Sequence, residues 1–137
     1  MDEAKRITVS RWLFKAHRDL DSAQRLADKS APLLDTAVYH CQQATEKSLK
    51  AFLVFHDVRA LKTHDLEVLV AETVVFTPNY ATLSDAAARL TQYATLFRYP
   101  GVQLEPTLAE YEQAYREASQ FVLITLSLIP AEAHTES

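Results

Sequence analysis

The 137-residue chain contains a single glycine, Gly101, and this scarcity constrains its fold more than any other feature. Strand-rich domains use glycine at tight turns and bulges, whereas a glycine inside a helix destabilises it by about 1 kcal/mol relative to alanine. The sequence therefore favours long helices. Its hydrophobic fraction of 48% and charged fraction of 23% are typical of a globular protein with a packed core. We expect one all-helical domain over residues 1–137, with its core at about 10–129.

Apolar residues recur at intervals of three and four positions in five segments, which is the pattern of amphipathic helices. The predicted helices span about residues 10–27, 35–56, 65–73, 80–97 and 107–128. Prolines, which disfavour helix at their own position and just before it, mark the breaks at positions 32, 78, 100 and 106. We therefore predict an up-and-down bundle of four to five helices. The tail, residues 131–137, is expected to be disordered.

The segment 35–56 carries an apolar arc of roughly 160°, which is wider than a surface helix requires. This width predicts that the segment forms the centre of the bundle. The sole cysteine, Cys41, lies within it and has no second cysteine to pair with. We interpret Cys41 as a small apolar side chain of the helix.

Polar side chains gather on the remaining face of this predicted helix. At 100° per residue, that face holds Tyr39, His40, Gln42, Gln43, Glu46, Lys47 and Lys50. The plainest interpretation is a solvated surface with one ion pair, Glu46 to Lys50, in the favourable i to i+4 order. The alternative is that this polar stripe forms part of a binding site.

Two further stretches combine polar or special residues at helix boundaries. They are KTHDL, residues 62–66, and LFRYPG, residues 96–101. A cation and an imidazole beside a helix N-terminus form a plausible anion site, because unsatisfied backbone amides and side-chain donors converge on phosphate oxygens. If the three stretches meet in space, they form a phosphate pocket.

The ordered set YHCQQATEKSLKAFLVFHDV (39–58), KTHDLEVLV (62–70) and FRYPG (97–101) resembles the HEPN family, specifically its small prokaryotic members. The resemblance covers about residues 11–129. It implies a bundle of four or five helices that is often a homodimer. It also implies a link to nucleotide or RNA binding, frequently with a minimal nucleotidyltransferase partner, as in a toxin–antitoxin module.

We accordingly expect a cleft that binds the phosphate of a nucleotide or RNA. The expected binding residues are Gln43, Glu46, Lys47, Lys50, Lys62, His64, Arg98 and Tyr99. In this scheme the lysines and Arg98 neutralise the phosphate, while Gln43 and His64 supply hydrogen bonds. Tyr99 shapes the pocket or stacks on the ligand.

Many HEPN proteins are metal-independent ribonucleases, whose motif is an arginine followed, after four to six residues, by a histidine. Arg98 matches the arginine, but Gln103, Leu104 and Glu105 stand where the histidine is expected. The residue that would assist attack by the 2′-hydroxyl is therefore missing. An atypical ribonuclease remains an alternative, with Arg98 and either His64 or His40 as its catalytic pair. A second alternative is a non-catalytic adaptor that docks a nucleotidyltransferase through the polar stripe.

Other site chemistries find little support in the sequence. The histidines lie at positions 17, 40, 56, 64 and 134, without the spacing of a metal site. One glycine cannot build a phosphate-binding loop, and there is no serine elbow. We therefore expect neither metal nor cofactor. Trp12, Tyr93, Tyr111 and Tyr115 could stack on bases, but their spacing favours packing in the core.

Charge and hydropathy bear on partners and location. A net charge of -4 argues against a broad nucleic-acid footprint, although local basic patches are compatible with it. The longest apolar run, residues 121–129, falls well short of the roughly 18 residues that span a bilayer. The N-terminus shows no secretory signal. We expect a cytoplasmic protein without a membrane segment.

Overall fold

The computed structural model describes residues 1–59, 62–101 and 105–135. Within them the chain forms α1 (Glu3–Leu26), α2 (Leu34–Phe55), α3 (Leu66–Thr73), α4 (Ser84–Thr91) and α5 (Leu108–Leu128). Short 3₁₀ turns lie at Ala81–Leu83, Gln92–Ala94 and Ala131–Ala133. The described part contains no strand, which confirms the predicted all-helical class. None of its helices is both long and apolar enough to cross a membrane.

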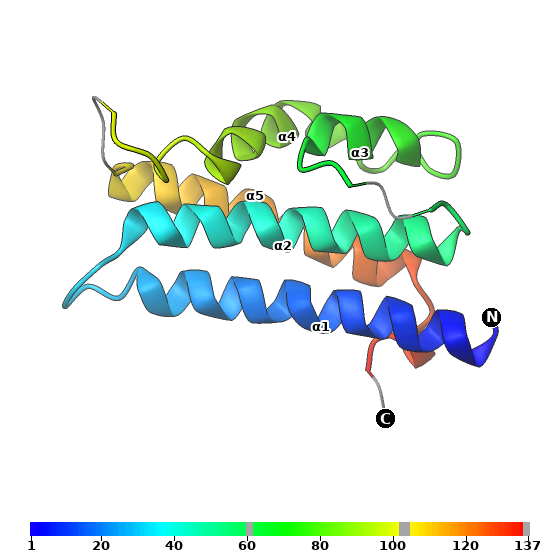
Figure 1. Ribbon diagram of the computed structural model, residues 1–137. Coiled ribbons are helices and arrows are strands. Elements are labelled where there is room, and N and C mark those ends of the chain that lie inside the picture. Colours follow the sequence, from blue (N-terminus) through cyan, green and yellow to red (C-terminus); the bar gives the residue numbers. More distant parts are fainter. Residues whose placement is uncertain (60–61, 102–104, 136–137) are drawn as a thin grey trace.

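Helix α2 occupies the centre of the bundle, as predicted from its wide apolar arc. It runs antiparallel to α1, while α5 packs against another of its faces (Figure 1). The short helices α3 and α4 lie on the side of α2 that faces away from α1 (Figure 1). Cys41, in the middle of α2, is fully buried, and burial raises the pKa of its thiol to about 12. It therefore behaves as an apolar side chain.

Side-chain caps determine where three of the helices begin. The Asp2 side chain accepts a hydrogen bond from the Lys5 backbone N–H at 2.7 Å, so α1 starts well before the predicted position 10. Asp65 caps α3 in the same way. At α5, Thr107 and Glu110 form a reciprocal capping box. Apolar periodicity alone did not reveal the start of α1, because the residues of that helix before Val9 are exposed or only partly buried.

The segment 80–97, predicted as one helix, is broken in the structure. Only Ser84–Thr91 is α-helical, with a 3₁₀ turn on each side. The Thr91 hydroxyl donates to the Ala87 carbonyl and accepts from the Leu66 backbone N–H, and such competing bonds commonly accompany a helix end. Because 3₁₀ and α turns both place apolar residues at three-residue intervals, the sequence pattern did not distinguish them.

A buried aromatic cluster joins the helices. Phe52 of α2 packs edge-on against Tyr80, with ring centroids 5.1 Å apart, and Tyr80 stacks on Phe121 of α5 at 6.2 Å. The Tyr80 hydroxyl lies 2.6 Å from the Thr125 hydroxyl, so its polar atom is satisfied inside the core. Tyr93 and Tyr111 are also buried, and Tyr115 packs against the same core. These tyrosines therefore serve packing, as their spacing predicted.

The chain after α5 differs from the disorder expected for residues 131–137. Ala133 is fully buried against Val9 and Leu13 of α1. The His134 ring nitrogen Nε2 lies 2.9 Å from the Ile129 carbonyl oxygen. Residues 131–135 thus form an ordered turn against α1, while positions 136–137 lie outside the described residues.

Replacing Phe52 with alanine tests the importance of the aromatic cluster. Phe52 is only 1% exposed and contacts the Tyr80 ring, so Phe52→Ala is expected to lower the free energy of unfolding by about 3–5 kcal/mol. Chemical denaturation followed by circular dichroism measures this. The matched control is Leu123→Ala, at a side chain that is 64% exposed, and its effect should stay within about 0.5 kcal/mol. Equal losses in both variants would contradict the central position of Phe52.

Candidate functional site

The polar stripe of α2 is buried at Gln42, Glu46 and Lys50 and half-buried at its other residues. Glu46 is 4% exposed and Lys50 is 6% exposed. The Lys50 ammonium donates to Glu46 Oε2 at 3.0 Å, which confirms the predicted ion pair. Glu46 Oε1 lies 2.8 Å from His64 Nδ1 and accepts from the Gln42 amide at 3.2 Å. The solvated surface of the plainest interpretation is therefore wrong for this part of the stripe.

The same network fixes the segment that leads into α3. The Gln42 amide nitrogen donates to the His64 backbone carbonyl at 3.1 Å, in addition to its bond with Glu46. Gln43 in turn donates to the Gln42 amide oxygen at 2.7 Å. The KTHDL stretch is thus bound to α2 through both the ring and the backbone of His64. Glu46 and Lys50 already satisfy each other, so neither offers an unpaired charge to a ligand.

A second polar cluster bridges α1 and α2. Asp19 of α1 lies 2.8 Å from His40 Nδ1 through one oxygen and accepts from the Lys47 ammonium at 2.6 Å through the other. Burial raises the pKa of Asp19, but the hydrogen bonds and charges of His40 and Lys47 outweigh it, so the net pKa is lowered. Asp19 was not among the predicted site residues. The sequence feature that could have indicated it is a carboxylate at a helix position between Ala16 and Ala23, which are buried.

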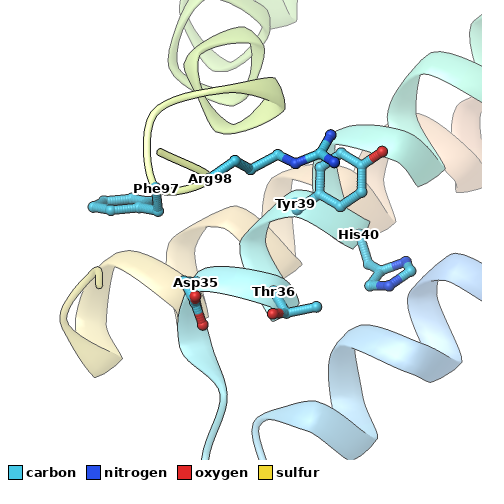
Figure 2. Close-up of a pocket in the computed structure, with 6 residues that line it drawn as sticks. All are labelled: Asp35, Thr36, Tyr39, His40, Phe97 and Arg98. Atoms are coloured by element: carbon cyan, nitrogen blue, oxygen red, sulfur yellow. The ribbon is translucent and has the colours of Figure 1, made fainter. Parts of the chain in front are cut away.

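The third group is a cleft between the start of α2 and the connection that follows α4. Its volume is about 340 Å³, and it is lined by Asp35, Thr36, Tyr39, His40, Phe97 and Arg98. Figure 2 shows the Arg98 side chain reaching from the connection across Tyr39, with the ring of His40 turned toward α1. The guanidinium carbon lies 4.4 Å from the centre of the Tyr39 ring, within the range of a cation–π contact.

Burial of its neighbour determines where Arg98 lies. Phe97 is 8% exposed and stacks on Tyr93 with ring centroids 5.9 Å apart, which anchors the connection to the core. The next residue, Arg98, is consequently held at the surface above α2. In the described part of the chain no carboxylate lies within ion-pair distance of its guanidinium. Its charge is therefore available to an anion.

The eight predicted site residues fall into separate groups, not one pocket. Gln43, Glu46, Lys50 and His64 belong to the Glu46 network, in which Glu46 and Lys50 are buried and the His64 side chain is 68% exposed, and Lys47 pairs with Asp19. Tyr99 is 69% exposed beside Arg98, and Lys62 is exposed before α3. His64 contacts Glu46, which lies seven residues beyond Tyr39 on α2, or about 10 Å along the helix axis. His40, by contrast, lines the same cleft as Arg98.

The described residues contain no group of three or more histidine, cysteine, aspartate or glutamate side chains suited to a metal ion. What the Arg98 cleft offers is a guanidinium, an imidazole and an aromatic ring at one surface. Guanidinium groups bind phosphate and carboxylate oxygens in a planar, bidentate geometry. The arrangement is thus suited to an anionic ligand that carries a polar or aromatic group.

Comparison with known proteins gives one match. A family model described as HEPN domain matches residues 9–128. This range contains most of α1, all of α2 to α5, and the whole Arg98 cleft. No curated protein and no solved structure matches the chain.

The Asp19 cluster predicts a defined dependence of stability on pH. Because its folded-state pKa lies below the unfolded value of 3.8, Asp19 stabilises the fold fully above about pH 4 and loses this effect as the pH falls through the lowered pKa. Asp19→Asn should therefore cost about 1–3 kcal/mol at pH 7 and progressively less below pH 4. Denaturant unfolding at several pH values measures the difference. Asp21→Asn, at an exposed site on α1, is the control, and a loss that does not change with pH would contradict the assignment.

Proposed function

The chain belongs to the HEPN family, and we propose that it binds the phosphate group of a nucleotide or an RNA in the Arg98 cleft. We further propose that it acts as a homodimer with a nucleotidyltransferase-type partner, in the manner of a toxin–antitoxin module. The observation that supports ligand binding most directly is Arg98 itself. It is an exposed cation with no carboxylate partner among the described residues, held 4.4 Å over an aromatic ring beside a cleft.

The chemistry of Arg98 suits phosphate. The ring of Tyr39 contacts one face of the guanidinium, so the N–H groups at its edge remain available to donate to phosphate oxygens. His40 lines the same cleft and supplies a second nitrogen. Pre-positioning a long cationic side chain on a ring reduces the conformational entropy lost when the ligand binds.

The remainder of the cleft favours a ligand with one anionic end. Asp35, one helical turn before Tyr39, would repel a second phosphate, but its carboxylate accepts hydrogen bonds from ribose hydroxyls or base amino groups. Thr36 adds a hydroxyl at the same end. The volume of about 340 Å³ lies near the lower limit for small-molecule sites. A mononucleotide unit of RNA combines these features.

A second candidate function is RNA cleavage without metal, and the position of His40 favours it. The family's ribonuclease motif lacks its histidine here, but His40 shares the cleft with Arg98. Its Nδ1 faces Asp19 at 2.8 Å, which leaves Nε2 as the nitrogen that could accept a proton from a 2′-hydroxyl. Between the two histidines considered from the sequence, this geometry supports His40 over His64, because His40 lines the cleft with Arg98, whereas His64 contacts Glu46 about 10 Å further along α2.

Titration of adenosine 5′-monophosphate and a short single-stranded RNA into the protein tests the proposal. Arg98→Ala should weaken binding about 10- to 100-fold, since charge-assisted hydrogen bonds of the lost guanidinium are worth about 1.5–3 kcal/mol. Calorimetry or fluorescence anisotropy measures the change. Arg116→Ala, at an exposed arginine of α5 outside the cleft, is the matched control and should bind as the unaltered chain does.

The same samples separate the alternatives. RNA cleavage in buffer with a metal chelator, lost in both His40→Ala and Arg98→Ala, would favour the ribonuclease. Binding that is equal in Arg98→Ala and the unaltered chain would reject the Arg98 cleft as the site. Absence of any binding would leave the adaptor role, which copurification of a partner protein would then support.

A further inference from the structure

A second cavity lies between α1 and the end of α5, away from the Arg98 cleft. Its volume is about 560 Å³, compared with about 340 Å³ for the Arg98 cleft. The residues that line it are Ser10, Phe14, His17, Leu126, His134 and Thr135. A cavity of this size is within the range of small-molecule binding sites.

The turn formed by residues 131–135 builds one wall of this cavity. After α5 the chain folds back and passes close to α1 (Figure 1). The Arg6 guanidinium donates to the Thr135 carbonyl at 3.1 Å, and Ala133 is fully buried against Val9 of α1. The wall is therefore an ordered part of the fold, which gives the cavity a defined shape.

The surface inside the cavity is mainly apolar. Phe14 of α1 and Leu126 of α5 supply most of its apolar side chains, and Phe14 is 54% exposed although it carries a large ring. The three- and four-residue spacing of Ser10, Phe14 and His17 places them along one stripe of α1. A ligand that packs on the Phe14 ring thus has a hydroxyl on one side of it and an imidazole on the other, and it removes apolar surface from water.

One end of the cavity offers hydrogen-bond acceptors. Ser10 is 1% exposed and donates to a backbone carbonyl of its own helix at 2.9 Å, so its oxygen can still accept. His134 lies 2.9 Å from a backbone carbonyl through Nε2, which must carry the hydrogen, and Nδ1 of the neutral ring is consequently an acceptor. The two residues lie at the same end, because Ala133 packs against Val9. This end is suited to a hydroxyl or N–H group of a ligand.

The other end of the cavity offers donors and positive charge. His17 lies seven residues beyond Ser10, or about 10 Å along α1, and it makes no hydrogen bond or ion pair with the described residues. The Arg18 guanidinium lies 5.8 Å from the centre of the Phe14 ring, and no carboxylate of the described chain is within ion-pair distance of it. Asp21, one turn beyond His17, is exposed, so water screens its charge. This end is suited to a carboxylate.

We infer that this cavity binds a small aromatic carboxylate that carries a hydroxyl or N–H group at the far end of its ring. The ring packs on Phe14 and Leu126, the carboxylate contacts His17 and Arg18, and the donor group lies at the Ser10 end. A saturated fatty acid shares the carboxylate but has no donor for that end. The inference is independent of the proposed function, because none of these residues lines the Arg98 cleft.

Titration with 3-(4-hydroxyphenyl)propionate, followed by calorimetry and nuclear magnetic resonance, tests the site. Binding should saturate at one ligand per chain and shift the signals of Phe14, His17 and His134. Phe14→Ala should weaken it about 5- to 10-fold through the loss of apolar contact. The matched control is Leu108→Ala, at a side chain that is also 54% exposed but lies at the opposite end of α5, and it should bind normally. Circular dichroism verifies that both variants fold.

Two analogues of this probe test the two ends of the cavity separately. Removing the hydroxyl, as in 3-phenylpropionate, should weaken binding about 2- to 10-fold. Replacing the carboxylate with a primary amide should weaken it about 10-fold or more. In the double variant His17→Gln, Arg18→Gln the acid and the amide should bind about equally, since the groups that distinguish them are gone. Arg116→Gln, at an exposed arginine of α5 outside the cavity, should preserve the preference for the acid.

Three results would overturn the inference. They are the absence of saturable binding of the hydroxyphenyl acid, equal affinity of the unaltered chain for the acid and the amide, and equal binding by Phe14→Ala and the unaltered chain. Sedimentation that shows a dimer dissociated by Phe14→Ala, without binding of the acid, would assign this face to an interface between copies instead. In every case the Arg98-dependent binding of adenosine 5′-monophosphate should be the same in Phe14→Ala, so the proposed function is tested separately.

Discussion

The Glu46 carboxylate lies inside the bundle with 4% of its residue surface exposed, and a buried charge of this kind is stable only when neighbouring groups neutralise it. Lys50, one turn further along α2, supplies the charge, and His64 and Gln42 complete the hydrogen bonding. His64 lies just before α3, so its bonds to Glu46 and Gln42 also hold the segment between α2 and α3 against α2. This network leaves the residues around Arg98 as the part of the polar surface open to a ligand.

Asp19 is a second buried carboxylate, and its contacts join α1 to α2 beside the Arg98 cleft. Its two oxygens engage His40 and Lys47, so the imidazole is held at the edge of the Arg98 cleft with one nitrogen occupied. The helix packing and the candidate site thus share one interhelical contact.

The features that the sequence predicted are those set by spacing within a helix. The all-helical bundle, the central position of α2 and the Glu46–Lys50 pair all follow from periodicity along one segment. Contacts between segments could not be predicted from this periodicity. Asp19 joins His40 only through the register of two helices, and Arg98 lies over Tyr39 because burial of Phe97 directs an irregular connection. The three motifs therefore predicted one pocket, whereas the structure places their residues in separate clusters.

The central claim is that a phosphate ligand contacts the Arg98 cleft and not the Glu46 network. Nuclear magnetic resonance of the isotope-labelled protein, titrated with adenosine 5′-monophosphate, measures this directly through the side-chain signals of Arg98, His40, His64 and Lys50. The account predicts saturable shifts for the Arg98 guanidinium and the His40 ring, with the His64 and Lys50 signals nearly unchanged. Large shifts at His64 and Lys50, with Arg98 unaffected, would contradict it.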